Sequence, residues 1–466
     1  MHSTSSVELH SPISQPGHRQ GDNEIITTRH SRTGDDSLER QQEFSLPSVD
    51  KGKDAWLFLF ASFFLEALVW GFPFSFGVFQ DYYHSHEPFA ESSGIATIGT
   101  CAMGIMYFAF PIAVALQRLY PRLARWAPSF GIISLCLALI LSSFSQNVTH
   151  LILTQGVLYA IAASFAYCPC MAWLEEWFVR RRGLAFGVMW SGTGTGGIAI
   201  PLILETLLQK YGFRTTLRIW AASLLVLSSP AFFFVKPRIP ASSTGSGRLR
   251  INLGFVYDRT FILYQVANIV ESLGYFLPTI YLPYYARSVL KASPFLAAFT
   301  VLLINVSNAA GIFLMGILAD RWHITTCILI STVGAVLATF FLWGFAGKLV
   351  ILYVFCVLYG LFAGSYVGTW PGVSRQVVSN HAGHESSPNG RSFDPTMVTG
   401  FLIAGRGIGN IVSGPLSEAL LKATSTQGQS GRIWGLGSYG AVIIFTGVTA
   451  LGGGSSYIWK KLGWLL

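Results

Sequence analysis

The hydropathy of this 466-residue chain alternates between long apolar runs and short polar loops. A helix needs about 20 mostly apolar residues to cross the hydrocarbon core of a membrane. Twelve runs of that kind can be drawn, and a polar stretch at 236–259 separates the first six from the last six. They lie near 56–80, 95–117, 127–145, 150–171, 183–208, 216–235, 260–285, 294–319, 324–345, 349–373, 396–421 and 435–459. We predict an all-α membrane protein with twelve transmembrane helices in two six-helix bundles.

Composition agrees with a chain surrounded by lipid. Charged residues make up 11% and apolar residues 52%, whereas an ordinary soluble domain has roughly 25% charged residues. The first 55 residues are polar and lack apolar periodicity, which favours a disordered tail. The predicted order is a cytoplasmic tail at 1–55, a bundle at 56–235, a cytoplasmic linker at 236–259, a bundle at 260–459 and a short cytoplasmic tail at 460–466.

The net charge of +9 does not indicate a nucleic-acid partner, because the basic residues are spread over short loops between apolar runs. If the N-terminal tail is cytoplasmic, the loops on its side are rich in arginine and lysine, as in Arg118, Arg122, Arg125 and Arg180 to Arg182. The opposite side has fewer basic residues, and its first loop is acidic. Cytoplasmic loops of membrane proteins are enriched in basic residues. We expect both termini in the cytoplasm and the protein in the plasma membrane.

An internal repeat links the two halves of the chain. Glu66 precedes Pro73 by seven residues in the first apolar run, and Glu271 precedes Pro278 by seven in the seventh run. Glycines repeat as well. The fifth run has the spacing 5-2-2 at Gly187, Gly192, Gly194 and Gly196, and the eleventh run has it at Gly400, Gly405, Gly407 and Gly409. Two repeats with broken, glycine-faced helices are typical of carriers that alternate their access.

Three ionisable residues lie inside apolar runs. A charge at the bilayer centre costs about 2.5–3.5 kcal/mol on insertion scales, so such residues usually face a cavity or a partner. We predict that Glu66, Glu271 and Arg406 face a central cavity, where Arg406 attracts an anionic group and one of the carboxyl groups exchanges a proton. The alternative is a structural pair, in which one glutamate only neutralises Arg406.

Other chemistry is not indicated. The chain shows no hydrolytic triad, phosphate-binding loop or metal-ligand cluster, and its six cysteines all lie in apolar segments. We therefore predict no enzyme activity, no cofactor and no metal. Aromatic residues near the proline breaks could line a substrate path, since each offers an apolar face and, for tyrosine and tryptophan, a polar tip. The candidates are Trp70, Trp190, Tyr275, Tyr281 and Trp370.

Several motifs resemble those of a known family. The stretch from Glu176 to Gly187, EWFVRRRGLAFG, resembles the fifth-helix signature of monocarboxylate transporters in the major facilitator superfamily. The seventh run, GYFLP followed by YLP, and the eleventh, GRGIG followed by GP, are similar to the fungal branch of that family. The resemblance implies the major facilitator fold over about residues 54–460. It also draws attention to Asn305, which matches an asparagine of the fungal branch and needs a hydrogen-bond partner in the membrane.

The departures from the family limit what the resemblance implies. Positions that are charged in proton-coupled lactate carriers correspond to Phe74, Asn308 and Ile312, which are all neutral. The loop motif GILADR, ending in Asp320 and Arg321, is similar to the inner-loop motif that latches the cytoplasmic side in the superfamily. With Arg181 and Arg182 these two residues form a predicted cytoplasmic gate. The matching loop of the first half, QRLYPR, lacks the acid.

We predict a secondary active transporter that moves a small organic solute, a carboxylate or another metabolite, by alternating access. Without a nucleotide-binding motif, an ion gradient must supply the energy, and protons are the expected coupling ion. Export of a larger, mostly apolar product such as a secondary metabolite or toxin is the main alternative, because an aromatic cavity with few charges suits it. A non-transporting membrane sensor that uses the fold for signalling is a further alternative.

Overall fold

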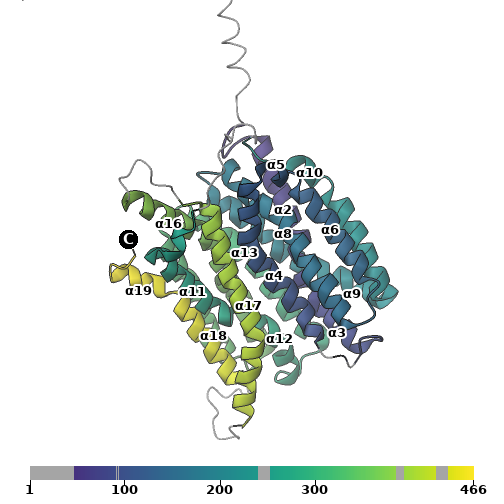
Figure 1. The fold of residues 1–466 in the computed structure, drawn as a ribbon. Helices are drawn as coiled ribbons and strands as arrows, with labels where there is room; N and C mark the ends of the chain where they lie inside the picture. The colour runs from purple at the N-terminus through teal and green to yellow at the C-terminus, as the bar shows by residue number, and fades with distance from the viewer. Residues whose placement is uncertain are drawn as a thin grey trace, which may run out of the picture. The chain divides into compact units, whose positions relative to one another are not determined.

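Over its described residues, each of the twelve predicted apolar runs coincides with a helix, or with consecutive helices, in the computed structural model (Figure 1). The structure describes residues 47–90, 92, 94–239, 252–384, 393–426 and 439–465. The predicted tail before Pro47, half of the predicted linker, at 240–251, and Leu466 at the end of the predicted C-terminal tail lie outside the described residues. Regular structure in the described part is helical throughout.

We call the helices up to α10 the first half and the helices from α11 onward the second half. The first half contains α2 (Lys53–Phe74), α3 (Phe76–Ser85), α4 (Ile95–Leu119), α5 (Pro121–Ala124), α6 (Ala127–Ser142), α7 (Val148–Leu151), the π-helix η1 (Ile152–Leu158), α8 (Tyr159–Trp177), α9 (Arg182–Ser228) and α10 (Ala231–Phe234).

The second half begins with the short 3-10 helix η2 (Gly254–Tyr257). It continues with α11 (Arg259–Tyr275), α12 (Leu277–Ser288), α13 (Pro294–Ala319), α14 (Ile324–Leu337), the π-helix η3 (Ala338–Trp343), α15 (Leu349–Ala363), the 3-10 helix η4 (Gly364–Thr369), α16 (Trp370–His384), α17 (Pro395–Thr426), α18 (Gly440–Gly453) and α19 (Ser455–Lys461).

The number of membrane crossings stays a prediction. By length and hydropathy alone, eight helices of the described residues could cross a membrane. One of these, Arg182–Phe234, covers both the fifth and the sixth predicted run. Gly212 interrupts it with φ 71° and ψ 169°, a conformation that breaks an α-helix. Large apolar side chains on the outer faces, among them Phe60, Phe130 and Val226, are exposed in the structure, as expected for surfaces that contact lipid.

Both predicted proline breaks are present. The first helix ends at Phe74, directly after Pro73, and resumes as α3 at Phe76. The seventh helix ends at Tyr275 and resumes as α12, which has Pro278 in its first turn. Proline lacks a backbone N–H and its ring clashes with the preceding turn, so a helix bends or restarts there. The repeat seen in the sequence is therefore a repeat of local structure.

The repeated glycines make the same contacts in each half. On α9, a methyl group added to Gly194 would meet Ala309 of α13 in the other half, whereas one added to Gly192 would meet the Phe63 carbonyl of α2 in its own half. On α17, Gly407, which is the repeat-mate of Gly194, faces Tyr107 of α4 in the other half. These faces let the backbones approach closely.

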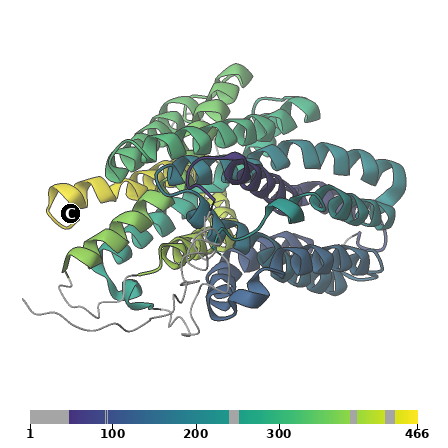
Figure 2. The same cartoon turned by 90° about the horizontal axis from the view of Figure 1, so that it is seen from above.

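The other repeated glycines show the same pattern of contacts. Gly187 of α9 and Gly400 of α17 face α13 and α4 of the opposite halves. Gly196 and Gly409, by contrast, face α2 and α11 of their own halves. As a result α9 packs along α13 and α4 packs along α17, and these two helix pairs join the halves. Figure 2 shows the blue first half and the green and yellow second half side by side.

Candidate functional site

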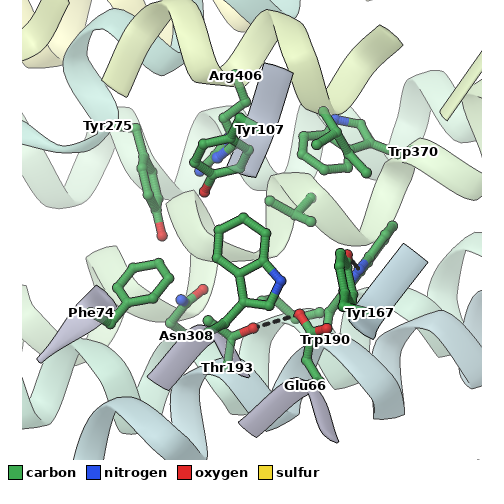
Figure 3. A pocket seen from close by; sticks show the side chains of 14 residues that line it. Glu66, Phe74, Tyr107, Tyr167, Trp190, Thr193, Tyr275, Asn308, Trp370 and Arg406 are labelled. Carbon is green, nitrogen blue, oxygen red and sulfur yellow. Dashed lines mark hydrogen bonds between the residues drawn. The ribbon is translucent and has the colours of Figure 1, made fainter. Parts of the chain in front are cut away.

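A cavity lies between the two halves at the level of the buried charges (Figure 3). Its volume is about 60 Å³, which is room for only a few water molecules. Both halves contribute to its walls. The lining residues are Glu66, Trp70 and Phe74 of α2, Tyr107 of α4, Tyr167 of α8, Trp190 and Thr193 of α9, Tyr275 of α11, Asn308 and Ile312 of α13, Val367 of η4, Trp370 of α16, and Ile403 and Arg406 of α17.

Arg406 supplies the positive charge of the cavity. Its side chain is only 2% exposed, and Nη1 donates a hydrogen bond to Oε2 of Glu271 at 2.9 Å. The guanidinium carbon lies 3.9 Å from the ring centre of Tyr275, within range of a cation–π interaction. Nη2 is buried and has no hydrogen-bond partner among the described residues. One terminal amino group of Arg406 is therefore bound to Glu271 and the other is not, although the hydroxyl groups of Tyr107 and Tyr275 also interact with the guanidinium.

Glu66 stands on the opposite wall (Figure 3). It is 2% exposed, and its Oε1 accepts a hydrogen bond from the hydroxyl of Thr193 at 2.8 Å. Its second oxygen, Oε2, is buried and finds no partner in the described part of the chain. A buried carboxylate without a cation is costly. Glu66 is thus ready to accept a hydrogen bond from a solute or to hold a proton.

These two polar pairs occupy equivalent positions in the repeat. Glu66 corresponds to Glu271, and Thr193 corresponds to Arg406, because 406 − 193 = 213 is the same offset as 400 − 187. In each half the glutamate of the first helix is bonded to the repeat-related residue of the fifth. The first half holds a hydroxyl where the second holds a guanidinium. The cavity therefore has an acidic wall and a basic wall on a symmetric frame.

Aromatic rings close the cavity on the side where α9 begins. Trp190 of α9 meets Trp370 of α16 edge to face, with ring centres 5.6 Å apart. The indole N–H of Trp190 donates to the Tyr167 hydroxyl at 3.3 Å, and that of Trp370 donates to Asn268 at 3.2 Å. Because the two tryptophans come from different halves, their contact can form only when the halves are together at this end.

The structure brings most of the predicted residues together. Glu66, Trp190, Tyr275 and Arg406 line the cavity, and Glu271 lies one hydrogen bond away, behind Arg406. The arginine thus fits both sequence-based interpretations, since it is paired and faces the cavity. Two candidates lie elsewhere. They are Asn305, whose amide donates to the Gly197 carbonyl at 3.2 Å and links α13 to α9, and Tyr281, which lies on α12 beyond the helix break.

Sequence reasoning passed over Tyr107, Tyr167 and Thr193. The signal for Thr193 was present, since it occupies the position of Arg406 in the repeat. The two tyrosines are polar aromatics inside apolar runs, and nothing in the linear pattern shows which way they point. Phe74, Asn308 and Ile312, which correspond to charged positions of lactate carriers, all line the cavity as well. At these three positions the walls of the cavity are uncharged.

Two groups of polar contacts, which we call the clasp, hold the halves together where α9 begins. In the first group, Asp320 at the end of α13 accepts hydrogen bonds from the backbone N–H groups of Gly183 and Leu184, each at 2.8 Å. These groups belong to the first turn of α9, where the helix dipole favours an anion. Arg375 lies beside Asp320, at 3.3 Å.

In the second group, Asp394 takes the place of the acid that the loop of the first half lacks. Arg118 at the end of α4 binds Asp394, with Nε 2.8 Å from Oδ2. Asp394 precedes α17, and its Oδ1 accepts from the backbone N–H of Thr396. The Thr396 hydroxyl donates to Glu175 of α8 at 2.8 Å. A carboxylate therefore sits at the start of α17 as well as at the start of α9.

Of the four residues of the predicted gate, only Asp320 makes a side-chain contact between the two halves. Asp320 crosses between the halves, whereas Arg321 is exposed and the cation beside Asp320 is Arg375. Arg182 lies 3.7 Å from Glu175 within the first half. The side chain of Arg181 is exposed, and its backbone N–H donates to Asp50 at 3.0 Å.

Asp50 corrects the predicted end of the N-terminal tail. Its carboxylate accepts three backbone N–H groups, those of Val179, Arg180 and Arg181, at 2.9–3.1 Å. Asp50, within the predicted tail, is therefore fixed to the loop before α9, and α2 begins at Lys53, before residue 56. The polar composition of this stretch concealed the contact, because a carboxylate that binds backbone N–H groups leaves no hydrophobic pattern.

Comparison with known proteins agrees with this geometry. The sequence model of the Major Facilitator Superfamily matches residues 55–387. The chain belongs to the major facilitator superfamily. It is accordingly a multi-pass membrane protein and a transporter. The MFS transporter asaE of Aspergillus flavus is 26% identical over 89% of this chain and 88% of its own length. The agnestins efflux protein AgnL12 of Paecilomyces divaricatus is 30% identical over 69% and 73%.

Two further similarities bear on the family and the fold. Monocarboxylate transporter 13 of Bos taurus is 30% identical over 57% of this chain and 61% of its own length, in agreement with the resemblance seen in the motifs. The crystal structure of the human organic anion transporter MFSD10 superposes with a TM-score of 0.58 over 85% of this chain and 97% of that chain. Its sequence is only 13% identical, so this likeness concerns the fold.

Proposed function

We propose that this transporter carries an organic acid together with a proton, and that in the cell it exports an acidic metabolite across the plasma membrane. The observation that carries the proposal is the free Nη2 group of Arg406. A guanidinium binds a carboxylate or a similar oxyanion with two parallel hydrogen bonds when both of its ends are available. An acidic solute would satisfy the donor that the protein leaves open.

The rest of the solute is expected to be apolar, and aromatic in part. Arg406 and Glu66 are the charged residues that line the cavity, and seven of the other lining residues are aromatic. Aromatic rings bind flat apolar groups well and place few polar demands on them. With a volume of about 60 Å³ the cavity is too small for such a solute. The structure thus fits a state without solute, closed at the clasp.

The direction of transport and the orientation in the membrane are inferred from relatives and charge. Among the similar proteins are the aspyridones efflux protein apdF of Emericella nidulans and the agnestins efflux protein AgnL12, which supports export of a secondary metabolite over uptake. Arg118, Arg180 and Arg375 cluster at the clasp end. Basic residues favour the cytoplasmic side, so the clasp would close the cytoplasmic entrance and both termini would lie in the cytoplasm.

Glu271 provides a route to proton coupling. When a solute anion engages Arg406, the carboxylate of Glu271 loses its counter-charge. A buried carboxylate without a cation tends to take up a proton. Anion and proton would then cross together, without net movement of charge, and Arg406 would return to Glu271 once both have left. Net export would then require the product of the anion and proton concentrations to be higher inside the cell than outside.

Proteoliposomes test this function directly. An imposed pH gradient is expected to accumulate an aromatic monocarboxylic acid on the alkaline side, and a protonophore should remove the accumulation. A membrane potential set with valinomycin should leave the rate unchanged, because the proposed step is electroneutral. A rate that follows the membrane potential, or accumulation that survives the protonophore, would refute proton cotransport.

Glu66 should affect binding more than coupling. In Glu66→Gln the amide still accepts from Thr193, and the wall loses its free carboxylate oxygen. A hydrogen bond to a charged group contributes about 1.5–3 kcal/mol, so KM should rise roughly tenfold or more for a solute that donates to Glu66. Dependence on the pH gradient should persist. Glu205→Gln, an exposed site on α9, is the control. An unchanged KM for every transported solute contradicts this role.

A further inference from the structure

A second, smaller cavity lies within the second half, next to Glu271. Its volume is about 10 Å³, close to the space taken by one water molecule. Glu271 lines this cavity and does not line the central one, while Tyr275 lines both. Glu271 therefore has the arginine on one side and an enclosed space on the other. Helices α14, α15 and α18 supply most of the remaining walls.

Two threonine hydroxyls at this cavity are unpaired. Thr332 of α14 is 4% exposed and Thr446 of α18 is 1% exposed, and the Oγ1 atom of each has no hydrogen-bond partner in the described part of the structure. A helical threonine usually bonds to the carbonyl one turn earlier. Thr339 and Thr449 do so, at 2.8 and 2.9 Å. The two cavity threonines leave this local bond unmade.

The other polar groups near Glu271 are already engaged. The Tyr359 hydroxyl donates to the Tyr275 carbonyl at 3.2 Å and the Tyr366 hydroxyl to the Gly453 carbonyl at 3.5 Å. Ser331 donates to the Phe362 carbonyl at 2.8 Å. The titratable and charged groups that face Glu271 are these tyrosines, Tyr275 on its own helix, and Arg406 from α17; α14 and α18 contribute hydroxyls only.

From this geometry we propose that the second cavity is a binding site for one buried water molecule, which bridges Thr332 and Thr446 and holds the neutral carboxyl of Glu271 while a solute occupies Arg406. A buried water typically makes about three hydrogen bonds to groups that would otherwise be unsatisfied. Two hydroxyls and one carboxyl provide them. Glu271 would then alternate between two partners, Arg406 when the carrier is empty and the water when it is loaded.

This inference rests on the proposed function. It explains how the carboxyl of Glu271 can lose its hydrogen bond to Arg406 and still have a hydrogen-bond partner. A buried polar group that loses its partner is destabilised unless it finds another. The water site offers that second partner within the same bundle. Protonation itself would occur on the side of the open central cavity, so no separate proton path is required.

The double variant Thr332→Val with Thr446→Val tests the site. Valine keeps the shape of threonine and removes the hydroxyl. Without the bridged water the neutral carboxyl loses its partner, so more acid is needed to load the carrier. Transport at neutral pH should fall about tenfold, and the pH of half-maximal rate should move about one unit to the acid side, so that a lower pH restores the rate. Each single variant should shift it less.

Thr339→Val is the matched control, because this buried threonine bonds only to its own helix. It should leave the pH profile unchanged. A double variant that folds, as judged by gel filtration and thermal stability, and keeps the wild-type profile would overturn the proposal. A rate that depends on sodium, with no shift of the pH profile, would assign the cavity to a cation and also overturn it.

A readout that does not need transport separates this inference from the proposed function. A high-resolution electron cryomicroscopy map of the purified wild-type protein should show water density between Glu271, Thr332 and Thr446. An empty cavity would overturn the water site even if the protein transports acids with protons. Conversely, if the wild type moves no acid under a pH gradient, the proposed function fails and the map still decides whether the water is present.

Discussion

Glu271→Gln is expected to abolish accumulation driven by a pH gradient while leaving exchange of solute for solute intact. Glutamine resembles the neutral, loaded form of the carboxyl, so the carrier can shuttle with solute bound. The empty form suffers, because Arg406 keeps its charge without a counter-ion. Removing one partner of a buried ion pair costs about 3–5 kcal/mol, which corresponds to a loss of net transport of about a hundredfold or more.

Stability measurements complete this test. The Glu271→Gln protein should melt at a lower temperature than the wild type in detergent, and an acidic solute should restore much of the loss by supplying the missing anion. In the double variant with Arg406→Gln both charges are gone, so stability should recover while exchange is lost. A Glu271→Gln protein that still accumulates acid under a pH gradient would eliminate this residue as the proton site.

Gly316→Ala should open the clasp. A methyl group at this position would collide with the backbone carbonyl of Gly183, and neither backbone can move away within its helix. Helices α9 and α13 must then separate, and the two hydrogen bonds from the start of α9 to Asp320 would be lost. Hydrogen bonds to a charged group contribute about 1.5–3 kcal/mol each, so the closed population should fall by tenfold or more.

Spin labels at the exposed positions Leu123 and Trp322 report this change, since both lie at the clasp end and belong to different halves. Their distance distribution should shift to longer values in Gly316→Ala. Gly77→Ala is the control, because an added methyl group there has nothing within 4 Å. If Gly316→Ala gives the wild-type distribution, the contact between α9 and α13 does not control closure.

The fold was largely predictable because lipid imposes a strong pattern on sequence. Every apolar run coincides with helical structure, and both proline breaks fall where Pro73 and Pro278 predict them. The glycine spacing also identified α9 and α17 as repeat-mates, and the structure adds which glycine faces which helix. These signals are local or periodic, which is why a single sequence contains them.

The site was less predictable because its contacts join distant segments. The sequence placed Glu271 and Arg406 at suitable depths, but the bond between them depends on how α11 and α17 pack. Similarly, the loop after α4 lacks the expected acid, and its Arg118 instead binds Asp394, 276 residues away. Only the packed structure shows that Arg118 and Asp394 form an ion pair across the interface between the halves.

The unlike walls of the central cavity have a consequence for selectivity. Because Thr193 stands where the repeat places Arg406, one pole of the cavity carries a cation that attracts anions and the other, at Glu66, carries none. A monobasic acid can therefore lie in a single orientation, with its carboxylate at one pole and a neutral tail at the other. A dibasic acid of the same length would place its second carboxylate at the Glu66 pole, where no cation can neutralise it, so monoacids should be preferred over diacids of suitable size.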